Sequence, residues 1–317
     1  MRFSTAVLCF LALAPNVGSA AEFILRADVA TKVYNGRPVV MWGFALDSAL
    51  DVEDGAVQIP GPVLTVPPGD STLTIRLKNK LPQLNGAPTP VSIVIPGQMA
   101  TMTPERAGNG RVRSFTHETA PGAVGTYTWN QLAPGTYLYM SGTHPAVQVQ
   151  MGLYGALKKD FSAGNVYQNI SYDKELILLY SEVDPALHDA VASDNYGPGK
   201  AVKSTINYQP RYFLVNGTLH APTDPALPAG AEGEQVLLRL LNAGLRTVAP
   251  LLQGAHMKLV AEDGKRYRFQ KEQYSVLLSA GKTTDALMNA QAGSYPLYDR
   301  RLTPGMGTLS ILQVAAP

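Results

Sequence analysis

The fold is decided by the stretch Gly69-Asp70-Ser71-Thr72-Leu73-Thr74-Ile75-Arg76-Leu77-Lys78-Asn79, in which a Gly-Asp turn leads into alternating apolar and polar residues. This alternation is typical of a strand with one buried face. The second half of the chain repeats the pattern, because Gly233-Glu234 precedes Leu237–Asn242 and, with one residue of adjustment, both copies end in Arg-Leu-x-Asn. The repeat indicates an internal duplication.

Short runs of β-branched and aromatic residues, separated by Gly, Pro, Asn and Asp, continue in both directions from this stretch. They are typical of strands, and they favour β-sandwiches or barrels because no long helices lie between them. One helix is expected over Asp184–Val191. We therefore predict an all-β chain of two tandem sandwich domains, 22–185 and 207–317, joined by a linker over 186–206. The expected strands are Phe23–Arg26, Val39–Phe44, Val63–Val66, Leu73–Leu77, Val91–Ile95, Gly125–Trp129, Thr136–Met140, Leu176–Ser181, Tyr212–Val215, Val236–Leu241, Lys258–Ala261, Tyr274–Leu278 and Leu309–Val314.

The first 21 residues are typical of a secretory signal peptide. Arg2 precedes the apolar stretch Phe3–Ala14, and the small residues Gly18–Ala21 follow it. Removal of the signal peptide takes away Cys9, the single cysteine of the chain, so the mature protein is expected to hold no disulfide and no thiolate ligand. No later segment is apolar over the roughly 20 residues that a membrane helix needs. We expect a secreted or periplasmic protein without a membrane span.

The charge balance argues against nucleic acid as a partner. The 317 residues include 26 Lys+Arg and 24 Asp+Glu. Nucleic-acid-binding domains are commonly strongly basic. The sequence also lacks a phosphate-binding Gly loop, a Gly-x-Ser-x-Gly elbow and a His-Glu-x-x-His pair, which mark common classes of enzyme.

Several ordered motifs resemble the multicopper oxidase family. In the first half they are Pro60-Gly61-Pro62, Pro134–Tyr139 and Gln148–Gly155, and in the second half they are Phe213–Gly217 and Arg239–Gly244. The resemblance implies cupredoxin-like Greek-key β-sandwich domains, the first of the N-terminal type of that family. In intact members it also implies copper-dependent oxidation coupled to the reduction of oxygen.

The same resemblance indicates where copper ligands would lie. A blue copper needs two imidazoles and a thiolate, and the family pattern adds about eight imidazoles for a trinuclear cluster, whereas this chain has five His and one Cys. The family pattern Ser-Ile-His-Trp-His-Gly is Ser92-Ile93-Val94-Ile95-Pro96-Gly97 here, and Tyr-His-Ser-His is Tyr139-Met140-Ser141-Gly142. The four ligand positions are therefore occupied by Val94, Pro96, Met140 and Gly142. We expect no copper centre, no catalytic residue and no cofactor.

Met140, His144 and His117 are the candidates for a residual metal site. A thioether would favour Cu(I), and His144 lies just beyond the altered motif. The alternative is structural, because a lone histidine is weak evidence for a metal site and Met commonly fills gaps in cores. His188 and His220 lie in connecting segments and are expected to be solvated.

The sequence thus predicts a secreted, non-catalytic binding or assembly component of the cell envelope or exterior, with a protein partner or self-assembly. A homo-oligomer, a trimer, is implied by the resemblance to two-domain members. Two alternatives stay open. One is a copper-binding or electron-transfer protein with remodelled Met and His ligands, and the other is an oxidase subunit completed by another chain.

Overall fold

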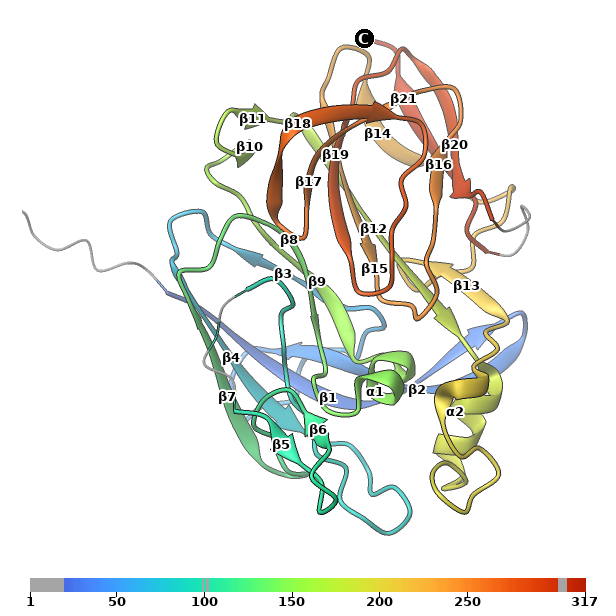
Figure 1. Cartoon of the computed structure of the whole chain (residues 1–317). Helices are drawn as coiled ribbons and strands as arrows, with labels where there is room; N and C mark the ends of the chain where they lie inside the picture. The colour runs from blue at the N-terminus through green and yellow to red at the C-terminus, as the bar shows by residue number, and fades with distance from the viewer. Residues whose placement is uncertain (1–19, 99, 101–102, 302–306) are drawn as a thin grey trace, which may run out of the picture.

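The computed structural model describes residues 20–98, 100, 103–301 and 307–317. Two β-sandwiches follow one another along the chain and pack against each other, the first drawn in blue to green and the second in yellow to red (Figure 1). The signal peptide expected over 1–21 lies outside the described residues except for Ala20 and Ala21, which open the first strand.

The first sandwich combines a four-stranded sheet of order β2-β1-β4-β7 with a three-stranded sheet of order β3-β9-β8. Strand β1 runs parallel to β4, and β2 and β7 are antiparallel to their neighbours. One apolar cluster fills this sandwich and includes Leu25, Phe44, Ile75, Trp129 and Tyr139. The strands are β1 (Ala20–Tyr34), β2 (Arg37–Asp47), β3 (Gly61–Val66), β4 (Thr72–Asn79), β7 (Val124–Asn130), β8 (Gly135–Met140) and β9 (Tyr154–Lys159).

The second sandwich combines a six-stranded sheet of order β13-β12-β15-β19-β17-β18 with a four-stranded sheet of order β14-β21-β20-β16. Its own apolar cluster includes Leu178, Leu240, Met257, Leu278 and Leu312. The strands are β12 (Lys174–Val183), β13 (Tyr212–Val215), β14 (Leu227–Ala231), β15 (Val236–Asn242), β16 (Pro250–Leu252), β17 (Met257–Glu262), β18 (Lys265–Gln273), β19 (Thr283–Met288), β20 (Gly293–Asp299) and β21 (Ser310–Ala315).

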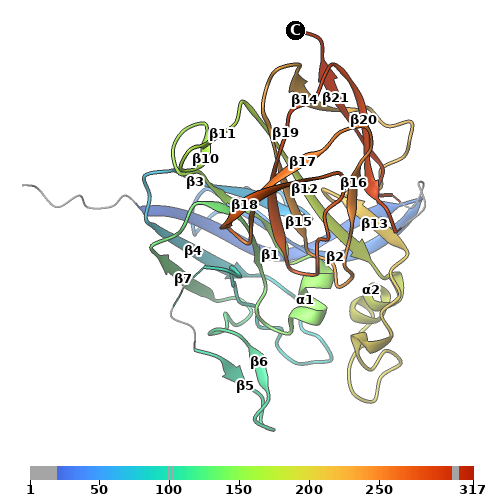
Figure 2. The ribbon, with the colours of Figure 1, turned by 45° about the horizontal axis from the view of Figure 1, so that its top comes forward.

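Two small hairpins and the helices complete the chain. The hairpin of β5 (Glu105–Arg106) and β6 (Val112–Ser114) projects from the first sandwich (Figure 2). The other hairpin is β10 (Asn165–Tyr167) with β11 (Ile170–Ser171). Helix α1 (Pro145–Met151) contacts both β2 and β12 and so lies between the two halves. Neither α1 nor α2, the α-helices of the described part of the chain, could cross a lipid bilayer.

The internal repeat of the sequence is also a repeat of structure. In the first half β1 is parallel to β4, which is antiparallel to β7; in the second half β12 is parallel to β15, which is antiparallel to β19. The asparagine that ends each repeat makes equivalent hydrogen bonds to the backbone. The Asn79 side chain bonds to the N–H of Leu81 and to two carbonyl groups, and Asn242 bonds to the N–H of Gly244 and to two carbonyl groups.

Strand β12 pairs with the second half of the chain. The expected boundary at residue 185 assigned this strand to the first domain, but β12 is hydrogen bonded to β13 and β15 in the six-stranded sheet. The division between the sandwiches therefore lies before Lys174. The expected linker over 186–206 is not a free connection either, because it contains most of α2 and a short 3-10 turn at Thr205–Asn207.

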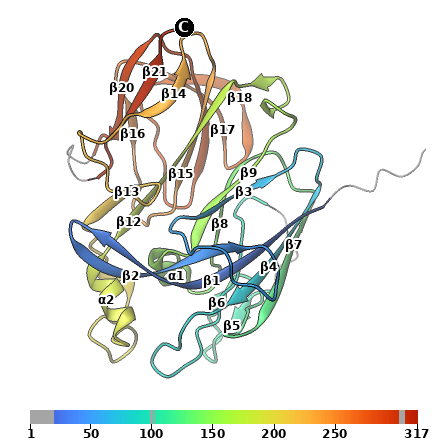
Figure 3. The same ribbon diagram turned by 180° about the vertical axis from the view of Figure 1, so that it is seen from behind.

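Helix α2 (Pro185–Ala192) forms where the sequence predicted it. The Asp184 carboxylate accepts a hydrogen bond from the N–H of Ala186, and Pro185 occupies the first helical position, which needs no N–H donor. The helix packs on β2, beside which it lies in Figure 3. His188 is therefore 1% exposed, and the expectation that it is solvated is wrong. Its Nδ1 lies 2.8 Å from the Val40 carbonyl oxygen.

Two expected strands form only isolated bridges. In the stretch 91–95, Val91 bridges to Thr119 and Val94 to Met140. Proline on either side of this stretch has no N–H to give to a ladder, which limits its length. The stretch 274–278 likewise makes single bridges to β16 and to Val248.

A buried ionic network joins the two sandwiches. The guanidinium of Arg239, fully buried on β15, donates to Asp160 at 2.6 Å, to Glu175 at 2.7 Å and to the Thr136 hydroxyl at 3.0 Å. Thr136 in turn donates to Asp285 on β19, whose other carboxylate oxygen accepts from Tyr167 at 2.6 Å. Because Thr136 and Tyr167 precede the division and Asp285 follows it, the network fixes one sandwich on the other.

Candidate functional site

The two altered motifs meet in the structure. Val94 and Met140 form an antiparallel backbone pair, with N–H to carbonyl distances of 2.9 Å and 3.0 Å. The N–H of Phe115 donates to the carbonyl of Gly142, which adds a third segment beside them. Residues that are far apart in the sequence therefore lie together at the end of β8.

Hydroxyl groups fill the interior at the end of β8, where the two altered motifs meet. The side-chain oxygens of Ser92, Ser114 and Thr143 lie 3.0 to 3.1 Å from one another, and all three residues are at most 1% exposed. Each of the three hydroxyls lies within hydrogen-bond distance of the other two, so burial leaves none of them without a partner. Beside the ring, Ser141 donates to Gln148 Oε1 at 2.6 Å, and Gln148 Nε2 donates to the Pro90 carbonyl at 2.8 Å.

His144 marks the turn from β8 into α1. Its backbone has φ 39° and ψ 55°, a left-handed conformation that is uncommon for residues other than glycine. The backbone is held there because the His144 N–H donates to the Arg113 carbonyl and the His144 carbonyl accepts from Val147 and Gln148. The imidazole is exposed and makes no capping hydrogen bond.

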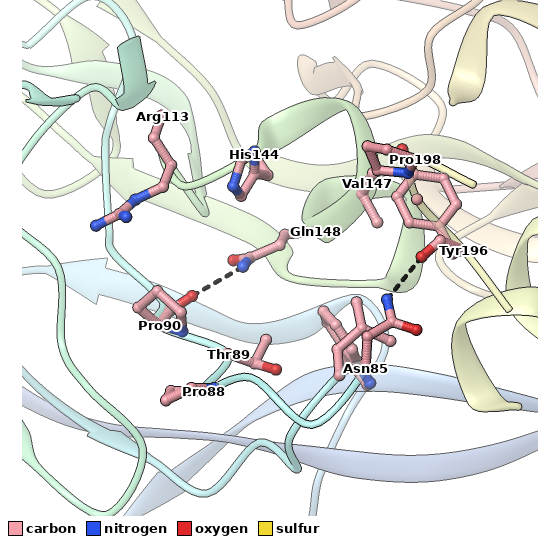
Figure 4. A pocket seen from close by; sticks show the side chains of 13 residues that line it. Asn85, Pro88, Thr89, Pro90, Arg113, His144, Val147, Gln148, Tyr196 and Pro198 are labelled. Carbon is pink, nitrogen blue, oxygen red and sulfur yellow. Dashed lines mark hydrogen bonds between the residues drawn. The ribbon is translucent and has the colours of Figure 1, made fainter. Parts of the chain in front are cut away.

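A cavity of about 400 Å³ opens beside His144. Figure 4 shows Arg113 and His144 at one side of it, Tyr196 and Pro198 at the other, and Gln148 between them. The loop 84–90, the turn into α1 and the loop that follows α2 enclose it, together with Trp42 of β2 and Arg113 of β6. The lining residues are Trp42, Leu84, Asn85, Pro88, Thr89, Pro90, Arg113, His144, Val147, Gln148, Tyr196, Gly197 and Pro198.

The polar groups of the cavity are unevenly placed. Arg113 donates through Nε and Nη2 to the carboxylate of Glu118, at 3.2 Å and 2.5 Å. Partial burial of the imidazole lowers the pKa of His144; the nearby Glu118 charge raises this pKa, and the Arg113 charge lowers it. The Thr89 hydroxyl is buried without a hydrogen-bond partner among the described residues. At neutral pH the imidazole of His144 is therefore uncharged. Arg113 is the charged residue among those that line the cavity.

The three predicted metal residues have separate surroundings. Met140 packs against an apolar cluster between the sandwiches that includes Leu138 and Leu179. His117 stacks on Tyr127 with ring centroids 4.3 Å apart, and its Nε2 lies 3.1 Å from the Thr126 carbonyl. His144 faces the cavity. No hydrogen bond joins any two of these three side chains in the part of the chain that the structure describes, so their joint role as a metal site stays a prediction.

Sequence analysis did not single out Arg113, Thr89 or Tyr196 as site residues. They belong to three segments whose contact depends on the packing of the loops around α1. The one available signal was the cluster of prolines at 88, 90 and 198, since rigid loops often frame a binding site.

Comparisons with known proteins point to copper oxidases and reductases. The family model described as multicopper oxidase matches residues 175–310. Laccase-7 of Oryza sativa subsp. japonica is 27% identical over 278 residues, which are 85% of this chain but 46% of the laccase, so the chain spans about half of that relative. A copper-containing nitrite reductase of Neisseria meningitidis is 25% identical over 302 residues, which are 91% of this chain and 69% of the reductase.

Solved structures define the class of the fold. The blue copper oxidase from Nitrosomonas europaea superposes with a TM-score of 0.69 at 20% identity, covering 93% of this chain and 86% of that one. The copper nitrite reductase from the same organism gives 0.69 at 19% identity and covers 94% of both chains. The protein therefore consists of two tandem cupredoxin-like Greek-key β-sandwich domains, as predicted from the sequence. The family model and the relatives indicate in addition that the chain is similar to multicopper oxidases, most specifically over residues 175–310.

Proposed function

We propose that this protein is exported from the cytoplasm and acts as a binding or assembly component of the cell envelope or exterior, with a cupredoxin scaffold that holds no copper centre. The observation that carries the proposal is the packing at Gly142, one of the four positions where the family resemblance puts a ligand. A Cβ atom added to Gly142 would lie 2.7 Å from Val94 Cγ1 and 3.1 Å from Ser92 Oγ. A side chain at this position would therefore require Val94 to move.

The donor chemistry around Gly142 does not fit a copper cluster. Val94, Pro96 and Gly142 offer no side-chain lone pair, and Met140 offers a thioether that packs against the cluster between the sandwiches. The hydroxyls of Ser92, Ser114 and Thr143 bond to one another. These groups support a role for the region in packing, and no catalytic step is derived through a metal.

The histidines of the chain are also dispersed. His188 is buried under α2, and His220 Nδ1 lies 3.6 Å from Asp224. His256 is exposed, with its ring edge-on to Tyr274. Within the described residues no group of three or more His, Cys, Asp or Glu side chains is arranged to hold a metal ion. The described histidines therefore offer no imidazole set for a copper cluster.

The test is metal loading of the full chain. The purified protein is incubated with Cu(II), and separately with Cu(I) under reducing conditions, then desalted and analysed for copper. We expect well under one copper per chain, no intense visible charge-transfer band, and no oxygen uptake with phenolic substrates. The copper-containing nitrite reductase of Neisseria meningitidis, treated in parallel, is the positive control for copper content. One or more tightly held copper ions per chain would overturn the proposal.

The copper-binding alternative has one feature in its favour, the exposed His144 imidazole. It predicts Cu(I) binding that falls in both His144→Ala and Met140→Leu, the second of which nearly conserves volume. Binding that survives Met140→Leu while the oligomeric state changes would make Met140 a packing residue. An oxidase subunit completed by another chain would hold copper only in the assembled complex.

A further inference from the structure

The cavity beside α1 has the size of a small-molecule site. Its volume of about 400 Å³ lies within the roughly 300–1,000 Å³ range of ligand pockets. Such pockets are lined mainly by apolar and aromatic side chains with a few polar groups that orient the ligand. The chemistry of the lining residues indicates which class of ligand fits.

The walls fit a flat apolar body. Trp42, Leu84 and Val147 supply apolar surface that belongs to, or packs against, the core of the first sandwich, so this part of the cavity is rigid. Tyr196 and Pro198 lie beside Val147 (Figure 4), and Tyr196 packs against the same apolar cluster. The Asn85 side chain holds this segment in place, because its Nδ2 donates to the Tyr196 carbonyl at 2.8 Å. Aromatic and proline rings contact a planar ligand over a large area at little conformational cost.

The charge at one end fits an anion. Arg113 is the single residue with a full charge at neutral pH among those that line the cavity, and no acidic residue lines it. Glu118 engages Nε and Nη2 of Arg113, whereas Nη1 has no hydrogen bond among the described residues. His144 adds an imidazole on the same side (Figure 4). Arg donates readily to carboxylates because its N–H groups match their oxygen atoms.

We propose that this cavity binds a small aromatic carboxylate, with the ring against Val147 and Tyr196 and the carboxylate at Arg113 and His144. The inference rests on the proposed function, since it names the ligand class of a binding protein. Thr89 also lines the cavity, and its buried hydroxyl has no hydrogen-bond partner among the described residues.

The test compares two probes of the same shape, 2-naphthoate and the uncharged 2-naphthamide, by isothermal titration calorimetry. We expect 2-naphthoate to bind the wild-type chain with a Kd below about 1 mM, at least tenfold tighter than 2-naphthamide. The double variant Arg113→Gln/Glu118→Gln removes the ion pair without leaving Glu118 unpaired. It should weaken 2-naphthoate about tenfold and leave 2-naphthamide unchanged.

Two further variants separate binding from folding. Arg111→Gln changes an exposed arginine outside the cavity and should leave both affinities as they are. Tyr196→Ala removes one wall and should weaken both probes. Thermal melts of every variant confirm that the fold is intact. Equal affinity for the two probes, an affinity for 2-naphthoate that survives the double variant, or no binding to the wild-type chain would each overturn the proposal.

The outcome is independent of copper loading. If the chain takes up copper and binds 2-naphthoate, the proposed function is refuted and the proposed carboxylate site is supported. If the chain takes up no copper and does not bind 2-naphthoate, the proposed function stands and the proposed carboxylate site is refuted.

Discussion

Arg239→Met should be among the most damaging single substitutions in this protein. The guanidinium is fully buried and donates to Asp160, Glu175 and Thr136, and its carbon lies 5.7 Å from the centre of the Tyr172 ring. Methionine fills much of the same space without the charge. The substitution leaves the carboxylates on both sides of the sandwich interface without their shared cation.

The expected loss follows from the environment of those carboxylates. Removing one partner of a buried ion pair costs about 3 to 5 kcal/mol. Asp160 and Glu175 are partly exposed, and Glu175 keeps Lys158, which limits the cost for these two groups. Asp285 is 1% exposed and is linked to Arg239 through the Thr136 hydroxyl, so its buried carboxylate adds to the loss. Burial already raises the pKa of Asp285, and the charge of Arg239 opposes this shift.

Urea unfolding measures the effect. Both tryptophans, Trp42 and Trp129, lie in the first sandwich, so fluorescence reports on that half and far-ultraviolet circular dichroism on the whole chain. We expect Arg239→Met to lose about 3 to 5 kcal/mol by both signals, because the network joins the halves. Arg268→Met, at an exposed arginine on β18, is the matched control and should lose less than about 0.5 kcal/mol. A loss below about 1 kcal/mol for Arg239→Met would refute the role assigned to the network.

Four other predictions concern the remaining features. Asn79→Ala and Asn242→Ala should each cost about 2 to 4 kcal/mol in urea unfolding, because three backbone groups lose a partner in each; a large loss for one and none for the other would contradict the structural repeat. Gly142→Ala should cost about 1 to 3 kcal/mol, and Val94→Ala added to it should restore part of that loss; an unchanged melting temperature in Gly142→Ala would contradict the close packing. Burial lowers the pKa of His188, so the unfolded chain binds the proton more readily, and His188 makes stability fall as the pH drops below about 6.5; His188→Gln should show a smaller fall in the urea midpoint between pH 7.5 and pH 5.5, and an identical fall would contradict this sign. A chelator should leave the melting temperature unchanged, because a structural metal would contribute folding free energy.

The local pattern of the sequence determined most of the secondary structure. Alternation in 73–77 and 236–241 predicts strands because a period of two places one face toward a core, and both form. The Asp184-Pro185 pair predicts the start of α2 because capping acts over a few residues of the chain. The motifs shared with multicopper oxidases were enough to predict the two cupredoxin-like sandwiches.

Tertiary structure decided what depends on contacts between distant segments. Sequence could not assign β12 to the second sandwich, because its apolar run fits a buried strand in either sheet and the pairing with β15 settles the choice. Nor could it predict that His188 is buried, since that depends on how α2 lies on β2. The cavity beside α1 is the clearest case, because Arg113 of β6, Val147 of α1 and Tyr196 of the loop after α2 line one space. Local propensity acts within a few residues, whereas a site of this kind exists only once the chain has closed around it.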